Sequence, residues 1–529
     1  MSTRTFPVRR ECAYAQVGQR LCAVDTMRGA RDRIGAAGLR AGGEVAVSDR
    51  LSPLDVSFLY LEERATPMHV GSVMIFRTGP GGLDFPHLLR HVEARIALVP
   101  RYRQRVRFVP GRIASPVWVD DEGFDITDHV RRGALPPPGG REQLEDLVAQ
   151  VQEGRLDRSR PLWEMIVVEG LAHDDGDARG ERFAVITKVH QALVDGVNAV
   201  DLGQVVLDET PDERDPPLQT WRPGPEPSSV ELVVSAVADT LRRPRQVLAD
   251  TARAGAGDLL AAGAKAAEVL GGLAVAARSA SRPPPRSPLT AESTGHRRFA
   301  MLTTDLEDYR RVRAFHLRSR ADEAGPAAAV NDVVLAVLAG ALRMWLQGRE
   351  ASVGSGSAVR ALVPMSVRAQ TPSDAGAIGS RVSSLLVDLP TGESSPLVRL
   401  HQVVYQTRAH REAGQALSAP AIAGMAGFAP PTLHSLGARV ASGLSRRLFN
   451  LVVTNVPGPQ HALYVERARM LASYPVIPLA KGQALAIGLT SYDGGVHYGM
   501  NGDRDAMPDL DDLRRCIVES LAELVEAAR

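Results

Sequence analysis

The chain has 529 residues, of which 44% are hydrophobic and 23% are charged, and its formal net charge is +1. This length is enough for two or three ordinary domains with buried cores. The balanced charge gives no basic field of the kind that nucleic-acid binding requires, so we expect no nucleic-acid partner. Cys12, Cys22 and Cys516 are too few for a disulfide scaffold, which favours a reducing cytoplasm.

The N-terminal residues 1–48 are rich in Arg, Gly and Ala and show weak periodicity, so we expect a disordered extension. A start at Met27 is the alternative. No apolar stretch follows the first arginines, which argues against a signal peptide. We also expect no membrane-spanning segment, because the longest uncharged run, 413–438, contains three prolines and many small residues. Peripheral contact with a membrane stays open.

Order is expected to begin at Leu51, where Ser52 is a suitable N-cap and Pro53 a suitable first residue of a helix. Farther along, apolar runs and helical spacing alternate up to about residue 207. The predicted strands cover residues 69–76, 165–169 and 183–187. The predicted helices cover residues 85–98, 144–156 and 199–207.

A break follows at 211–227, which is rich in Pro and acidic residues. Residues 230–280 then suggest one or two amphipathic helices, and a Pro-rich segment at 282–288 ends this region. A second ordered half begins near Arg297. Its predicted strands cover 298–305, 358–364, 382–389, 450–455 and 484–492, and its predicted helices cover 330–346 and 510–528.

These patterns predict an α/β fold of two halves, each alternating strands and helices. We divide the chain into an N-terminal extension (1–48), an N-terminal half (49–215), a Pro-rich and helical linker (216–296) and a C-terminal half (297–529).

The most informative segment is 188–196, which follows the apolar run 183–187 and ends in Asp195 and Gly196. A strand followed directly by such a turn can present His190 or Gln191 to a cavity. Gly196 would allow a tight turn. Asp195 is interpreted as structural, pairing with an arginine or capping backbone N–H groups.

Segment 188–196 resembles the His-His-x-x-x-Asp-Gly signature of acyl-CoA-dependent acyltransferases, with Gln191 in place of the second histidine. Several further motifs, spread over roughly 51–527, resemble one family, the bacterial wax ester synthase/diacylglycerol acyltransferases. These motifs are Leu51–Asp55 with Phe58 and Leu59, Pro67–Gly71, Pro161–Trp163, Asn331–Ala336, Val363–Arg368, Thr454–Pro459 and Ser491–Gly494.

The resemblance implies the fold of chloramphenicol acetyltransferase and peptide-synthetase condensation domains, with two related halves, mixed sheets and a tunnel between them. It also implies transfer of a fatty acyl group from acyl-CoA to diacylglycerol, giving triacylglycerol, or to a long-chain alcohol, giving a wax ester. No bound cofactor and no metal are expected, since no His, Cys and carboxylate set has ligand spacing.

An alcohol becomes a good nucleophile only when its proton is removed, and histidine suits this role near neutral pH. In the family the second histidine is that base, so Gln191 is a serious departure, because a carboxamide is no base. The first histidine is mostly structural, and neighbouring side chains on an extended segment point to opposite faces. Asn331 or a nearby backbone N–H is the candidate donor to the oxyanion.

Three readings stay open: an active or slow O-acyltransferase with His190 as base or with substrate positioning alone; an inactive homologue that binds acyl-CoA or lipid; and an acyltransferase with an unusual acceptor. His69, Trp163 and Pro457–Pro459 are interpreted as structural. We expect a cytoplasmic protein, and peripheral contact with the inner face of the plasma membrane or with a lipid droplet, through the helices of 230–280, stays open.

Overall fold

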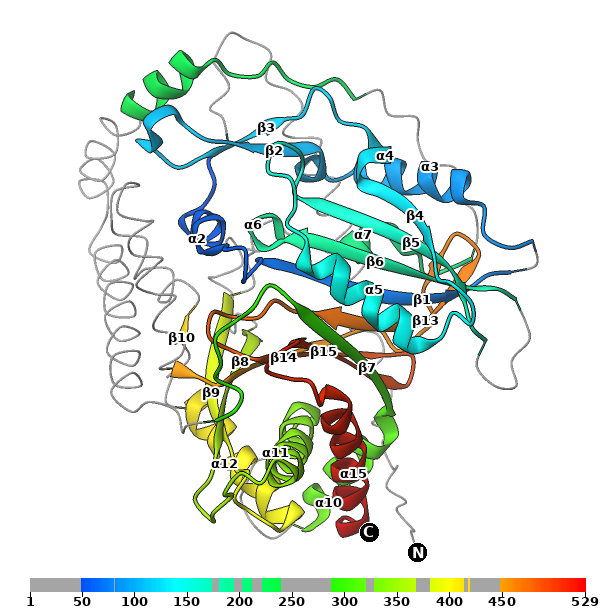
Figure 1. Cartoon of the computed structure of the whole chain (residues 1–529), viewed down its shortest axis with the longest axis vertical. Coiled ribbons are helices and arrows are strands. Elements are labelled where there is room, and N and C mark those ends of the chain that lie inside the picture. Colours follow the sequence, from blue (N-terminus) through cyan, green and yellow to red (C-terminus); the bar gives the residue numbers. More distant parts are fainter. Residues whose placement is uncertain are drawn as a thin grey trace, which may run out of the picture. The chain divides into compact units, whose positions relative to one another are not determined.

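The computed structural model describes residues 49–79, 81–173, 180–194, 202–211, 221–238, 287–319, 328–367, 381–412, 417–418 and 448–529. Its elements are labelled in Figure 1. The predicted extension 1–48 lies outside these residues, and so does the linker between 239 and 286. The sections below concern the described residues.

The first sheet has six strands, in which all neighbouring pairs are antiparallel except the parallel pair β5–β4. Its order is β12 (Tyr464–Val465), β13 (Ala468–Val476), β1 (His69–Arg77), β6 (Arg182–His190), β5 (Trp163–Leu171) and β4 (Val130–Ala134). β12 and β13 come from the region that our division assigns to the C-terminal half. The C-terminal half therefore contributes two strands to the first sheet, although the division itself stays a prediction.

The second sheet has seven strands and is mixed, because β11 runs parallel to both of its neighbours. Its order is β10 (Leu417–Ser418), β9 (Arg381–Leu389), β8 (Val359–Val367), β11 (Leu451–Pro457), β14 (Leu485–Tyr492), β15 (Gly495–Asp503) and β7 (Arg297–Asp305). β11 pairs with β8 only through Leu451 and Val452. Beyond these two residues the recorded pairing of β11 is with β14 alone.

Helices cover one face of the second sheet, as Figure 1 shows for α11 and α15. The central one is α11 (Val330–Gly348), which packs against α10 (Leu306–Ser319), α12 (Pro396–Glu412) and α15 (Leu510–Ala527). By length and composition α11 could cross a membrane, but 72% of its apolar window is buried inside the protein. It is a core helix of this sheet, and that burial accounts for its apolar sequence.

The first sheet buries both of its faces. One face packs against α2 (Pro53–Leu61), α3 (Phe85–Ile96) and α7 (Leu202–Val206). The other face packs against α5 (Arg141–Glu153) and β7. Because strand side chains alternate, Ala184, Ile186 and the next even-numbered residues of β6 belong to this second face.

The remaining elements are short and connect the larger ones. They are the 3-10 helices η1 (Pro100–Arg103) and η2 (Pro110–Arg112), the two-stranded sheet β2 (Gln104–Arg107) and β3 (Val117–Asp120), α4 (Ile126–His129), α6 (Gln191–Val194) and the helix Ser229–Ala238. That last helix lies in the predicted linker. Leu232 and Ala236 on its inner face pack against the two-stranded sheet.

Candidate active site

The end of β6 is where the structure places the first two candidate residues. His190 is the last residue of β6 and Gln191 is the first of α6. The N–H of His190 donates to the carbonyl of Leu162 over 2.9 Å, and the N–H of Gln191 donates to the carbonyl of Met68 over 2.9 Å. The backbone on either side of the strand-to-helix junction is therefore fixed by two neighbouring segments.

The His190 ring is buried, with a relative exposure of 1%. Its Nδ1 accepts the N–H of Ala192 over 3.0 Å, so Nδ1 holds the lone pair and Nε2 carries the proton. Burial lowers the pKa of His190 to about 3, although the charge of Glu62 works in the opposite direction. The only basic nitrogen of this neutral ring is already occupied, so His190 is poorly suited to remove a proton from an alcohol.

Glu62, the residue after α2, is the centre of a buried charge cluster. Its Oε1 lies 3.0 Å from Nε2 of His69, and its Oε2 lies 3.9 Å from Nε2 of His190. Oε2 also accepts from Nη2 of Arg155 and from Nε of Arg158, both over 3.1 Å. Burial alone would raise the pKa of Glu62, but His69, His190 and Arg158 outweigh burial and lower it. Glu62 is thus an ionised carboxylate whose Oε2 accepts from two arginines, while its Oε1, close to His69, accepts no hydrogen bond among the described residues.

Lys188 is a second buried charge on the same face of β6. Its ammonium group donates to the carbonyl of Val151 over 2.7 Å and to Oε1 of Glu164 over 2.8 Å. Burial lowers its pKa, and Glu164 opposes that change. Lys188 therefore ties β6 to the last turn of α5 and to β5, which is a structural duty.

Gln191 is partly buried at the start of α6. Asp195 and Gly196 lie outside the described residues, so their predicted roles stay predictions. The structure thus gives the base position a fixed backbone, while the second half of the motif is not described.

Asn331 lies in the first turn of α11, in the other half of the chain. Its Oδ1 accepts from Nδ2 of Asn455, at the end of β11, over 3.1 Å. Its own Nδ2 is buried and has no hydrogen-bond partner among the described residues. The turn that holds it is capped by Asp332, whose Oδ2 accepts the N–H of Ala329 over 2.8 Å. Asn331 is therefore a fixed buried donor, as an oxyanion site needs.

Three residues that we interpreted as structural have structural contacts. His69 pairs with His190 across β1 and β6 and belongs to the Glu62 cluster. Trp163 is a core residue whose Nε1 donates to the carbonyl of Tyr102 over 2.8 Å. The N–H of Gly458, within Pro457–Pro459, donates to the carbonyl oxygen of Ser491 over 2.9 Å. A Cβ at Gly458 would lie 2.6 Å from that oxygen.

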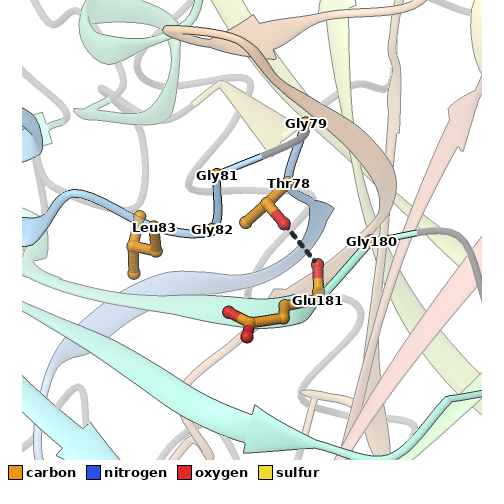
Figure 2. A pocket seen from close by; sticks show the side chains of 7 residues that line it. All are labelled: Thr78, Gly79, Gly81, Gly82, Leu83, Gly180 and Glu181. Atoms are coloured by element: carbon orange, nitrogen blue, oxygen red, sulfur yellow. Dashed lines mark hydrogen bonds between the residues drawn. The ribbon is translucent and has the colours of Figure 1, made fainter.

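A pocket of about 430 Å³ lies at the other end of β1 and β6, and Figure 2 shows the residues that line it. These are Thr78, Gly79, Gly81, Gly82, Leu83, Gly180 and Glu181. Arg77 pairs with Arg182 at this end of the two strands, whereas His69 pairs with His190 at the opposite end. This pocket contains no candidate residue, and the tunnel beside residues 190 and 191 stays a prediction.

No group of three or more His, Cys, Asp or Glu side chains with metal-binding geometry occurs in the described part of the chain. The expectation that no metal and no bound cofactor take part is not tested by this finding, and it stays an expectation.

Two family models match the chain in tandem. The wax ester synthase/diacylglycerol acyltransferase catalytic domain matches residues 51–334, and the WS/DGAT C-terminal domain matches residues 378–525. The chain belongs to the wax ester synthase/diacylglycerol acyltransferase family.

Individual members of this family show the same likeness. The probable diacylglycerol O-acyltransferase tgs3 of Mycobacterium tuberculosis is 44% identical over 267 residues, which are 50% of this chain and 95% of that protein. The probable diacylglycerol O-acyltransferase tgs2 of the same species is 33% identical over 498 residues, covering 90% of this chain and 99% of that protein. The solved wax ester synthase/diacylglycerol acyltransferase from Marinobacter aquaeolei VT8 is 28% identical with a TM-score of 0.61, covering 90% and 99%. The predicted family and its two-half α/β fold are thereby confirmed.

Sequence reasoning missed the centre of the cluster around His190. Glu62 follows one family motif, and Arg155 and Arg158 precede the Pro161–Trp163 motif of this acyltransferase family. Their closeness to these motifs was a usable signal, because a charged residue beside a buried strand end needs a partner of opposite charge. The sequence did not show that the two segments meet at His190.

Proposed function

We propose that this chain is an acyl-CoA-dependent O-acyltransferase that moves a fatty acyl group to diacylglycerol, to a long-chain alcohol, or to both. Its two family domains, which match residues 51–334 and 378–525, carry this proposal. In this reaction the alcohol oxygen bonds to the thioester carbonyl carbon, the C–S bond breaks, and the alcohol proton ends on the CoA sulfur. We propose that no metal or bound cofactor takes part.

The set of catalytic groups that we propose for this chain is incomplete, because it has an oxyanion donor and no general base. Nδ2 of Asn331 would donate to the oxyanion of the tetrahedral intermediate, since it is a buried donor with no partner among the described residues. Gln191 cannot accept the alcohol proton, and the buried His190 ring cannot readily replace it. Loss of general-base help slows such steps by about 10²–10⁴. We therefore propose slow transfer that depends on substrate positioning.

The test is release of CoA thiol by the purified protein with palmitoyl-CoA and either diolein or hexadecanol. We expect slow release by the natural chain and a rise of about 10²–10⁴ in Gln191→His. Gln191→Asn is the matched control, because it changes the same position without adding a base. If neither the natural chain nor Gln191→His releases thiol above background, while both remain folded, the proposed activity is wrong.

The second candidate is an inactive homologue that binds acyl-CoA or lipid. The combination of Gln191 with a neutral, hydrogen-bonded His190 favours it. Calorimetric binding of palmitoyl-CoA without any turnover, including in Gln191→His, would select this candidate over slow catalysis.

We also propose a cytoplasmic protein that contacts a lipid surface through the helix Ser229–Ala238. Its outer face carries three exposed valines spaced four and three residues apart, which we call the valine stripe: Val230, Val234 and Val237. Their relative exposures are 72%, 61% and 49%. A small apolar stripe on one helical face suits shallow contact with the surface that would hold diacylglycerol.

A further inference from the structure

We propose that Glu62, held by Arg155 and Arg158, is a positioning residue that acts through His190 to fix the strand-to-helix turn at residue 191. Glu62, Arg155 and Arg158 lie outside segment 188–196, although they act through His190 within it. The proposal rests on the proposed function only in taking residue 191 as the reacting position.

The geometry begins with the cap of α6. His190 precedes the first residue of this helix, and its Nδ1 accepts the N–H of Ala192, two residues on. This is the arrangement of an N-cap side chain, with imidazole nitrogen in place of the usual oxygen. The cap fixes the peptide that follows residue 191. It exists only while the His190 ring is neutral, because an imidazolium has no acceptor nitrogen.

Glu62 is the charged group beside the other ring nitrogen. With Nδ1 occupied by Ala192, the protonated Nε2 lies 3.9 Å from Oε2 of Glu62, beyond hydrogen-bond distance, so the carboxylate acts on the ring through its charge. α2, which ends just before Glu62, packs against α6, and both helices lie beside the same end of β1 and β6 (Figure 1). The carboxylate therefore lies on the Nε2 side of the ring, whereas the cap of α6 uses Nδ1.

A carboxylate alone at this place would favour the imidazolium and break the cap. Burial is the main cause that lowers the pKa of His190, and His69 on β1 with Arg155 and Arg158 before β5 lowers it further, against the carboxylate of Glu62 after α2. The same cluster contains Glu164 on β5 and Lys188 on β6. The two arginines bind the same Oε2 that faces His190. Glu62 thus acts on the ring through its charge, while the arginines offset that charge.

The experiment measures amide hydrogen exchange at Ala192 together with thiol release, in the full chain carrying Gln191→His. We expect Glu62→Gln and Arg158→Met to speed exchange at Ala192 by about tenfold or more. Arg158→Met should also raise the pH below which the protection of Ala192 is lost, because Glu62 would then favour the imidazolium. The matched control is Arg349→Met, which removes a comparable two-bond pair with Asp509 at the far end of α11.

A conservative variant separates positioning from general loss of structure. Asn is a good N-cap and does not titrate, so His190→Asn should keep Ala192 protected and make that protection independent of Glu62. Exchange at Ala192 that is the same in Glu62→Gln, Arg158→Met and Arg349→Met would overturn the proposal. Faster exchange in the first two variants without thiol release in any variant would support the positioning role and refute the proposed activity.

Discussion

The buried neutral state of His190 predicts a specific dependence of stability on pH. Burial lowers the pKa of His190 from its ordinary value of 6.5 to about 3 in the folded chain. A histidine whose folded pKa lies below its unfolded pKa stabilises the fold fully above pH 6.5. That stabilisation is lost as the pH falls toward the folded pKa, because the unfolded chain binds the proton first.

The size of the loss follows from the unfolded pKa. Between about pH 8 and pH 5, a ring that stays neutral in the folded state loses about 2 kcal/mol of stabilisation. Other buried histidines whose pKa burial lowers, such as His69, His129 and His497, contribute in the same direction. A substitution at His190 is therefore needed to isolate its share.

His190→Asn provides that substitution, because Asn can keep the cap on Ala192 and does not titrate. The free energy of unfolding would be measured by urea titration at several values between about pH 8 and pH 5, with the slopes compared to confirm similar unfolding. We expect the natural chain to lose about 2 kcal/mol more than the variant. His296→Asn, at a solvent-exposed ring, is the control and should follow the natural chain. Parallel curves for the natural chain and His190→Asn would refute the neutral buried ring.

Three further predictions concern the packing of β1 against β6, the oxyanion donor and the lipid contact. Gly71→Ala should destabilise the chain by about 3 kcal/mol or more in thermal unfolding, because a Cβ there would lie 1.9 Å from the carbonyl oxygen of Thr187. Gly354→Ala is the control and should be nearly neutral, because there is open space around Gly354. Asn331→Ala in the Gln191→His background should lower thiol release by about 10²–10³ with little change in unfolding temperature. Replacing the valine stripe with serines should weaken co-sedimentation with triolein droplets and leave thiol release from detergent-dispersed substrate unchanged.

The strands that frame the site could be predicted because their signals are local. The run before His190 is apolar and bounded by a turn motif, and the structure has it as β6. β13 was not predicted, although its burial alternates along the strand, since Arg469 and Pro475 interrupt the apolar pattern. Its place beside β1 also depends on pairing between segments about 400 residues apart, as in Gly71 with Val476. Such pairing leaves no mark in the local sequence.

The sequence motifs named candidate residues for the site, which stay predictions, but they did not reveal the surroundings of these residues. Alternation along an extended segment implied that His190 and its neighbour diverge, but Gln191 begins α6, so strand alternation does not apply to this pair. The charge cluster beside His190 was not predicted, because Glu62 and Arg158 are 96 positions apart in sequence and meet only in the fold.

The contacts described above hold the backbone at residue 191 through groups other than its side chain. The cap, the two backbone hydrogen bonds and the Glu62 cluster all act on groups other than the side chain at 191. Exchange of His for Gln at this position therefore removes the base without removing any of the contacts that hold its backbone. For this reason Gln191→His, made in the natural chain with no other change, is the substitution that separates a missing base from a lost site.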